Sequence, residues 1–190
     1  MKISKTLILA ALGVISLNSC GEGNAEKDAA VPMQNDSRSA EEAEVSKNLD
    51  DGSKTANPEF KNEDIAAVYS HYSHVKTALV NSNAEEAQNG GEMLVKALQQ
   101  TESAEDALEA AEKIAKSENL NEQRTAFSDL SGAVENILSG SLASGEIYKQ
   151  YCPMAFEGAG GYWLSSSEEI RNPYYGDKML KCGSVRDTLQ

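Results

Sequence analysis

Residues 63–80 read EDIAAVYSHYSHVKTALV, and this stretch decides the fold. Its large apolar residues recur at i, i+3, i+4 and i+7, the spacing that lines one face of an α-helix. They are Ile65, Val68, Tyr69, Tyr72, Val75 and Leu79. Glu63 and Asp64 fall in the first turn, where acidic side chains interact favourably with the helix dipole. Asn81-Ser82-Asn83 then ends this helix and caps the next one.

Three more amphipathic segments follow at short intervals. The second has Ala87, Gly91, Leu94, Val95 and Leu98 on one face, and the third has Ala107, Leu108, Ala111, Ile114 and Ala115. The fourth follows Asn121, ends near Gly140 and carries Phe127, Leu130, Val134, Ile137 and Leu138. Because the links are short and no alternating strand pattern occurs, the sequence predicts an all-α fold, an antiparallel four-helix bundle.

Two local features refine this prediction. Ser103 is expected to cap the third helix, with Asp106 at the capping-box position. The pair Gly90-Gly91 either weakens the second helix or lets a neighbouring helix approach closely.

Residues 145–190 differ in composition from the helical part. Seven of the eleven aromatic residues lie between Tyr148 and Tyr175, a density that disordered segments lack. Frequent glycine and proline interrupt any long regular element. We therefore expect an ordered, loop-rich C-terminal cap folded against the bundle, with short helical turns near residues 167–171 and 177–181.

The first nineteen residues have the features of an export signal. Lys2 and Lys5 form the positive region, and an apolar stretch from Leu7 to Leu17 is too short to span a bilayer. The ending Leu17-Asn18-Ser19-Cys20 resembles the lipobox of bacterial lipoproteins, which predicts cleavage of the signal peptide 1–19 and lipidation of Cys20. Several acyl chains would anchor the protein stably to a bacterial membrane, periplasmic or at the outer membrane and cell surface. A plain secretory signal with an incidental cysteine is the alternative.

Residues 20–60 are expected to form a flexible acidic tether, since they hold few large apolar residues and these show no sustained period. The domain is then residues 61–190. The formal net charge of −13 argues against nucleic acid and anionic headgroups as partners.

The two remaining cysteines each stand beside a methionine. Tyr151-Cys152-Pro153-Met154 places Cys152 and Met154 at i, i+2, which share a side of an extended chain. Met179 and Cys182 are at i, i+3, which share a face of a helical turn. If the two segments meet, four sulfur atoms form one cluster.

Thiolate and thioether ligands favour a soft ion, and the prediction is a Cu(I) site made by Cys152, Met154, Met179 and Cys182. Two alternatives stay open. In an oxidising compartment the cysteines could form a structural disulfide, with the methionines as core filler. One cysteine could instead be a reactive thiol.

The two histidines both fall on the first helix. His71 lies at the edge of the apolar stripe, from which it could reach the cap as a nitrogen ligand or simply bond to backbone or solvent. His74 lies nearly opposite. Cys152 with His71 as nucleophile and base lacks support, and no nucleophile elbow, phosphate loop or zinc-protease motif occurs, so no enzymatic activity is expected.

Several blocks resemble one bacterial family without an assigned function. They are Tyr72-x-x-Val75-Lys76, Arg124-x-Ala126-Phe127, Tyr151-Cys152-Pro153-Met154-Ala155, Tyr162-Trp163-Leu164-Ser165, Ile170-Arg171-Asn172-Pro173-Tyr174-Tyr175-Gly176 and Lys178-Met179-Leu180-x-Cys182-Gly183. Its members are exported proteins or lipoproteins, and some are fused to periplasmic adaptor subunits of copper/silver efflux pumps. The resemblance, over residues 62–189, implies a helical fold and heavy-metal handling. The expected function is therefore Cu(I) binding as buffer, chaperone or efflux-pump accessory, and the alternative is a disulfide-stapled interaction module for a membrane protein without metal.

Overall fold

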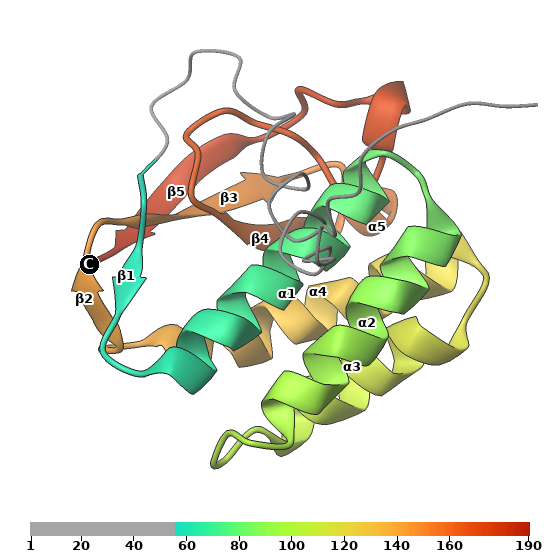
Figure 1. The fold of residues 1–190 in the computed structure, drawn as a ribbon. Coiled ribbons are helices and arrows are strands. Elements are labelled where there is room, and N and C mark those ends of the chain that lie inside the picture. The colour runs from blue at the N-terminus through green and yellow to red at the C-terminus, as the bar shows by residue number, and fades with distance from the viewer. Residues whose placement is uncertain (1–55) are drawn as a thin grey trace, which may run out of the picture. The chain divides into compact units, whose positions relative to one another are not determined.

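The four predicted helices are all present in the computed structural model, which describes residues 56–190. Figure 1 shows the helices α1 to α4 packed side by side, with the C-terminal strands against one side of them. The elements, in chain order, are β1 (Glu59–Phe60), α1 (Glu63–Val80), α2 (Ala84–Leu98), α3 (Glu105–Lys116), α4 (Leu120–Leu138), β2 (Leu142–Ser144), β3 (Ile147–Cys152), α5 (Ala155–Gly158), β4 (Gly161–Ser165), the 3-10 turn η1 (Gly176–Lys178) and β5 (Ser184–Leu189).

The helix ends follow local capping chemistry, with one departure from the prediction. Asn62, Asn83 and Asn119 each precede a helix, and each side chain accepts a hydrogen bond from a backbone N–H of the first turn. Ser103 does not cap α3. It adopts a positive φ of 56°, and α3 begins after Ala104 without a side-chain cap. The predicted capping box is therefore wrong, because Ser103 turns the chain instead of receiving the helix N–H groups.

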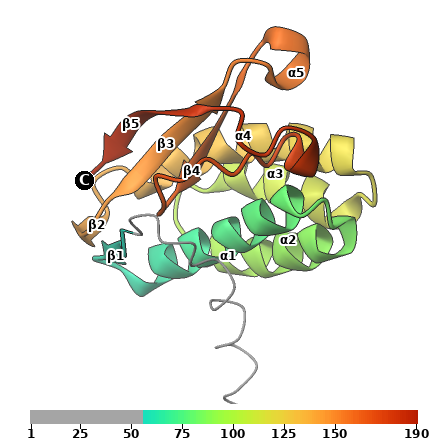
Figure 2. The ribbon, with the colours of Figure 1, turned by 90° about the horizontal axis from the view of Figure 1, so that it is seen from above.

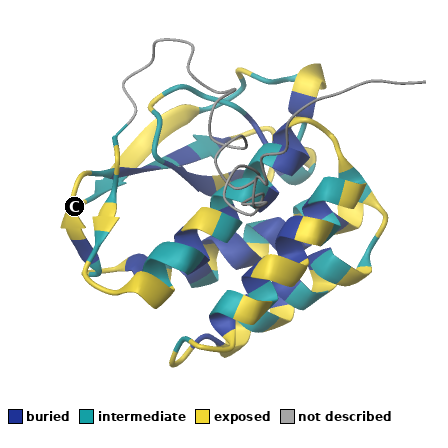
Figure 3. Ribbon diagram, in the orientation of Figure 1, coloured by how far each residue is buried: buried dark blue, intermediate teal, exposed yellow. Residues whose placement is uncertain are grey.

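The core lies between the helices, as Figure 3 shows by the dark inward faces. Val68, Tyr72, Val75 and Leu79 of α1 are fully buried, as the periodicity predicts. Gly91 permits a close approach of α2 and α3, because an added Cβ would lie 2.9 Å from the Ala115 nitrogen. The alternative in which the glycines serve helix packing is therefore the one that the structure shows.

The C-terminal cap is a small β-sheet, which corrects the all-α prediction. Strands β4, β3 and β5 pair antiparallel in that order, while β1 and β2 form a separate two-stranded sheet. Figure 2 shows the three strands on one side of the helices, with α5 at the tip of the β3–β4 hairpin. Of the two expected helical turns, η1 overlaps the second, and no helix forms at residues 167–171.

The strands lack the apolar alternation that marks a sheet. In β3 the buried side chains include the polar Gln150, which is 0% exposed and donates to the carbonyls of residues 167–169. A polar residue at a buried strand position hides the period-2 pattern. This is the physical reason why the cap reads as irregular in the sequence.

Two polar side chains join the helices to the cap. The Tyr72 hydroxyl of α1 contacts Ser131 Oγ of α4 at 2.8 Å and accepts from the Leu164 N–H of β4 at 2.9 Å. Arg124 of α4 donates to the Pro173 carbonyl at 3.0 Å and to Ser82 Oγ at 3.0 Å. The sheet and the loop that follows it are thus fixed to α1 and α4.

The signal peptide, Cys20 and the tether up to residue 55 lie outside the described residues. The predicted domain boundary at residue 61 falls just after β1, whose residues pair with β2. Within residues 56–190, no helix has both the length and the apolar character needed to cross a membrane.

Candidate functional site

Cys152 and Cys182 meet in the structure. Their Sγ atoms lie 2.6 Å apart, although the residues are 30 positions apart in the chain, and both cysteines are free. Cys152 is the last residue of β3, and Cys182 stands two residues before β5, which pairs with β3. The antiparallel pairing of these strands is what brings the two thiols together.

The separation of the thiols distinguishes the chemical states of the pair. Two sulfurs that bind one tetrahedral ion at ~2.3 Å are held roughly 3.8 Å apart, whereas a disulfide bond is about 2.05 Å long. At 2.6 Å the pair is nearer to the bonded distance. Binding of an ion would therefore require one thiol to swing outward by about 1 Å, by rotation about its Cα–Cβ bond.

The surroundings of Cys152 are apolar and closed. Cys152 is 0% exposed and pairs across the hairpin with Gly161, over which the Tyr174 ring lies; an added Cβ on Gly161 would meet that ring at 2.6 Å. Tyr174 also packs against Phe127, Phe156 and Trp163. Burial raises the pKa of the Tyr174 hydroxyl, and Cys152 adds a smaller contribution in the same direction. The Cys152 side of the pair is thus sealed from water.

Cys182 is held by the loop that precedes β5. Asn172 is 0% exposed, and its Nδ2 donates to the Cys182 carbonyl at 2.9 Å. Its Oδ1 accepts from the Tyr174 N–H at 2.8 Å, and its own N–H donates to the Leu180 carbonyl at 2.8 Å. One buried amide therefore fixes both ends of the segment 172–182. In the sequence, Asn172 stands out only as part of the block from Ile170 to Gly176, and nothing there indicates this role.

The surroundings of Cys182 favour its protonated thiol over its thiolate. Its hydrogen bond with Cys152 raises the pKa of the Cys182 thiol, partial burial adds to this, and a backbone hydrogen bond from Met154 opposes it. Reactive disulfide-exchange catalysts have a depressed thiol pKa. The raised pKa of the Cys182 thiol therefore differs from the pKa of such catalysts.

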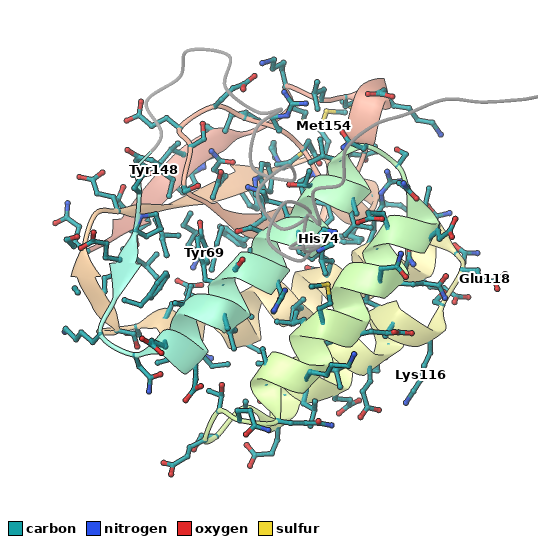
Figure 4. All side chains as sticks on the ribbon, viewed as in Figure 1. Tyr69, His74, Lys116, Glu118, Tyr148 and Met154 are labelled. Atoms are coloured by element: carbon teal, nitrogen blue, oxygen red, sulfur yellow. The ribbon has the colours of Figure 1, made fainter. Side chains whose placement is uncertain are left out.

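Both predicted methionine ligands contact Cys182, but they do so through their backbones and not through their sulfur atoms. The Met179 carbonyl accepts from the Cys182 N–H at 3.0 Å, and the backbone of Met154 hydrogen-bonds the Cys182 thiol. Met154 is 52% exposed at the edge of the cap (Figure 4). The expected extended run through Met154 is wrong, because the chain turns after Cys152 and Met154 has αR geometry. Met179 is partly buried.

Within residues 56–190, His71 does not join Cys152 and Cys182 in a group of three side chains that could hold a metal ion. His74 binds Glu86 of α2 at 2.5 Å, and Val75 touches the position of Gly90 in α2. His71 precedes these two residues by three and four positions, so it shares their face of α1. That face looks toward α2, whereas the thiols lie in the sheet beside α4. His74 (Figure 4) hydrogen-bonds Glu86 and so links α1 to α2.

Other places in the described part of the chain lack a comparable set of groups. Within residues 56–190, no three His, Cys, Asp or Glu side chains are grouped so that they could hold a metal ion. A metal at the thiol pair would therefore depend on sulfur ligands. A hollow of about 650 Å³ lies between α3 and α4, and one of about 260 Å³ lies between α4 and the β3–β4 hairpin. Neither is lined by a cysteine, and the larger has mainly polar and charged walls.

Comparison with known proteins gives one match. Residues 68–145 match the model of a family described as a protein of unknown function (DUF3347). These residues run from α1 through β2, so the match covers the helices and stops before the thiol pair. No curated protein matches the chain, and no solved structure does. Over these residues, the chain is similar to this uncharacterised family.

Proposed function

We propose that this protein is a lipid-anchored, extracytoplasmic protein that binds a soft metal ion, Cu(I), between Cys152 and Cys182. It would act as a buffer, a chaperone or an accessory of an efflux pump. The convergence of the two thiols from segments 30 residues apart is the observation that carries the proposal. Sulfur ligands select Cu(I) over hard cations such as Mg²⁺ and Ca²⁺.

The methionines would complete the site. The backbones of Met154 and Met179 both contact Cys182, and the Met154 side chain is 52% exposed, so its thioether would be free to change rotamer on binding an ion. Cys182 is only partly buried and follows a turn, so it is the thiol with room to move outward. The bound ion would then sit at the surface of the cap, with Cys152 below it.

An anaerobic titration with Cu(I) against a chromophoric chelator tests this proposal. The protein is the full-length chain in detergent with Cys20→Ser, which leaves Cys152 and Cys182 as the only thiols. We expect sub-micromolar affinity for the reduced protein, a loss of at least ~100-fold with both cysteines changed to serine, and a smaller loss with Met154→Leu. Met93→Leu, an exposed methionine of α2, is the matched control and should bind as the parent does. Failure of the reduced parent to compete would refute the proposal.

A second function is favoured by the short distance between the thiols. At 2.6 Å the pair is closer to a disulfide than to two ligands of one ion, so the protein could be a disulfide-stapled module that binds a membrane-protein partner. Thiol counting on protein isolated from its native membrane separates the two. A fully oxidised pair from which no thiol is ever recovered would favour the stapled module.

A further inference from the structure

We propose that Cys182 is the only sulfur of the pair that a partner thiol can attack, so that the mixed disulfide with the partner forms and is resolved at Cys182. The partner class is a small-molecule thiol or a dithiol protein. This inference deepens the proposed function because it concerns the same pair, but it needs only the two sulfurs and no metal.

The first argument is access. Cys152 is 0% exposed, and so are Ala155, three residues further along the chain, and Trp163 in the neighbouring strand β4. Cys182 is partly exposed and lies between the exposed Lys181 and the exposed start of β5. Exchange rates depend on the access of the attacking thiolate to one particular sulfur. Only one of the two sulfurs meets that condition.

The second argument is direction. A thiolate attacks a disulfide sulfur from the side opposite to the bond that breaks. Attack on Cys182 therefore arrives along the line from Cys152 through Cys182, which leads from the buried sulfur to the partly exposed one. Attack on Cys152 would have to arrive from the opposite side, yet Cys152 is 0% exposed and belongs to the same buried core as Tyr174 and Trp163. The core blocks that path.

The reaction balances without any further reagent. A partner thiolate forms a bond to Cys182 Sγ, the Cys152–Cys182 bond breaks, and Cys152 leaves as a thiolate that takes up a proton. A second partner thiolate then attacks the partner's own sulfur in the mixed disulfide and releases Cys182 as a thiolate, which also takes up a proton. The protein disulfide is reduced by two electrons, and two partner thiols become one disulfide.

The environment of the released Cys152 fits this order of events. After the first step its sulfur stays beneath Tyr174 in the closed part of the cap, where an external oxidant or thiol cannot reach it. The mixed disulfide on Cys182 is meanwhile at the surface, where the partner can complete the reaction. The fold thus protects one sulfur while the other is exchanged.

Two measurements test the proposal. In the Cys20→Ser background, Cys152→Ala leaves Cys182 as the single thiol and Cys182→Ala leaves Cys152. Reaction with a chromogenic aromatic disulfide is followed in the folded proteins and again in guanidinium. We expect Cys182 to react at least ~10-fold faster than Cys152 when folded, and the two rates to agree within about twofold when unfolded. Equal rates in the folded state, or a faster Cys152, would overturn the proposal.

The second measurement needs no cysteine variant within the pair. The pair in the Cys20→Ser protein is oxidised with diamide, reacted briefly with glutathione, and then quenched with iodoacetamide in guanidinium, which unfolds the protein so that every free thiol is alkylated before peptide mapping. Glutathione should be found on Cys182 and the carbamidomethyl group on Cys152; the reverse pattern contradicts the inference. Copper titration of the reduced Cys20→Ser protein reports separately, so that absence of copper binding together with preserved selectivity at Cys182 rejects only the proposed function.

Discussion

The hydroxyl of Tyr72 joins α1, α4 and β4, and replacing Tyr72 with phenylalanine tests how much this junction stabilises the fold. Ser131 has one hydroxyl proton, which it donates to the Phe127 carbonyl at 2.8 Å. The Tyr72 hydroxyl must therefore donate to Ser131 and accept from the Leu164 N–H. Phenylalanine keeps the ring stacked on Phe127 at 5.1 Å and removes only these two bonds.

The expected cost follows from burial. Tyr72 is 0% exposed and Leu164 is 1% exposed, so the Leu164 N–H would be left without a partner in the core. An unsatisfied buried donor costs about 1–3 kcal/mol, and the lost bond to Ser131 adds about 1 kcal/mol. We expect Tyr72→Phe to lower the free energy of unfolding by roughly 2–4 kcal/mol.

Urea unfolding followed by the fluorescence of Trp163, the single tryptophan, measures this change. Ser131→Ala removes the acceptor of the Tyr72 hydroxyl and the bond from Ser131 to the Phe127 carbonyl, and should cost about 1–3 kcal/mol because the buried Tyr72 O–H loses its partner. Tyr162→Phe is the matched control, since Tyr162 is 47% exposed, and should change the stability by less than about 0.5 kcal/mol. A loss below about 1 kcal/mol for Tyr72→Phe, with an unchanged denaturant slope, would refute the reasoning.

Three other changes have expected outcomes by the same assay. Gly91→Ala should lower the free energy of unfolding by about 1–3 kcal/mol, because the added Cβ would press on the backbone of α3. Gly132 is an exposed helical residue whose added Cβ would meet no atom within 4 Å, so Gly132→Ala should raise the free energy of unfolding by up to about 1 kcal/mol. Equal effects of the two substitutions would contradict the packing argument. Burial, with a contribution from a nearby arginine, lowers the pKa of Lys76 from 10.5 to about 8, so the unfolded chain binds more protons between these values and stability should rise with pH across that window. Lys76→Met should abolish this rise in stability, and a variant whose stability rises with pH as steeply as that of the parent would contradict the assignment to Lys76. Oxidation of Cys152 and Cys182 closes a loop of 30 residues and should stabilise the Cys20→Ser protein by about 3–4 kcal/mol over its reduced form; identical midpoints would exclude this.

The helices could be predicted because their apolar residues repeat at helical spacing. The α1 stripe from Val68 to Leu79 is buried as expected. The sheet could not be predicted, because β3 buries Gln150 and β4 spans only Gly161–Ser165. A short strand with a buried polar side chain has no period to detect. The dense aromatic residues, which favour strands, were the available signal.

The sequence was sufficient to predict which two cysteines meet, but not how the residues around them are arranged. Cys152 and Cys182 stood out by composition, and the structure brings them together. The position of Met154 depends on a turn after Pro153, and that of His71 on which face of α1 meets α2. The role of Asn172 comes from backbone groups at both ends of a loop, which a linear pattern does not show. Such contacts appear only once the chain is folded.

The opposite ends of β3 give the domain a polarity. The backbone N–H of Ala56 bonds to Ser166, and Asn57 abuts Gly145, so the first described residues lie where β3 starts. Cys152 closes the far end of β3, five residues and ~17 Å further along. A protein held to a bilayer through its N-terminal segment would present its sulfur atoms on the distal side of the strand. If the proposed anchor and the proposed copper site are both correct, the point of attachment and the metal would therefore lie at opposite ends of one strand.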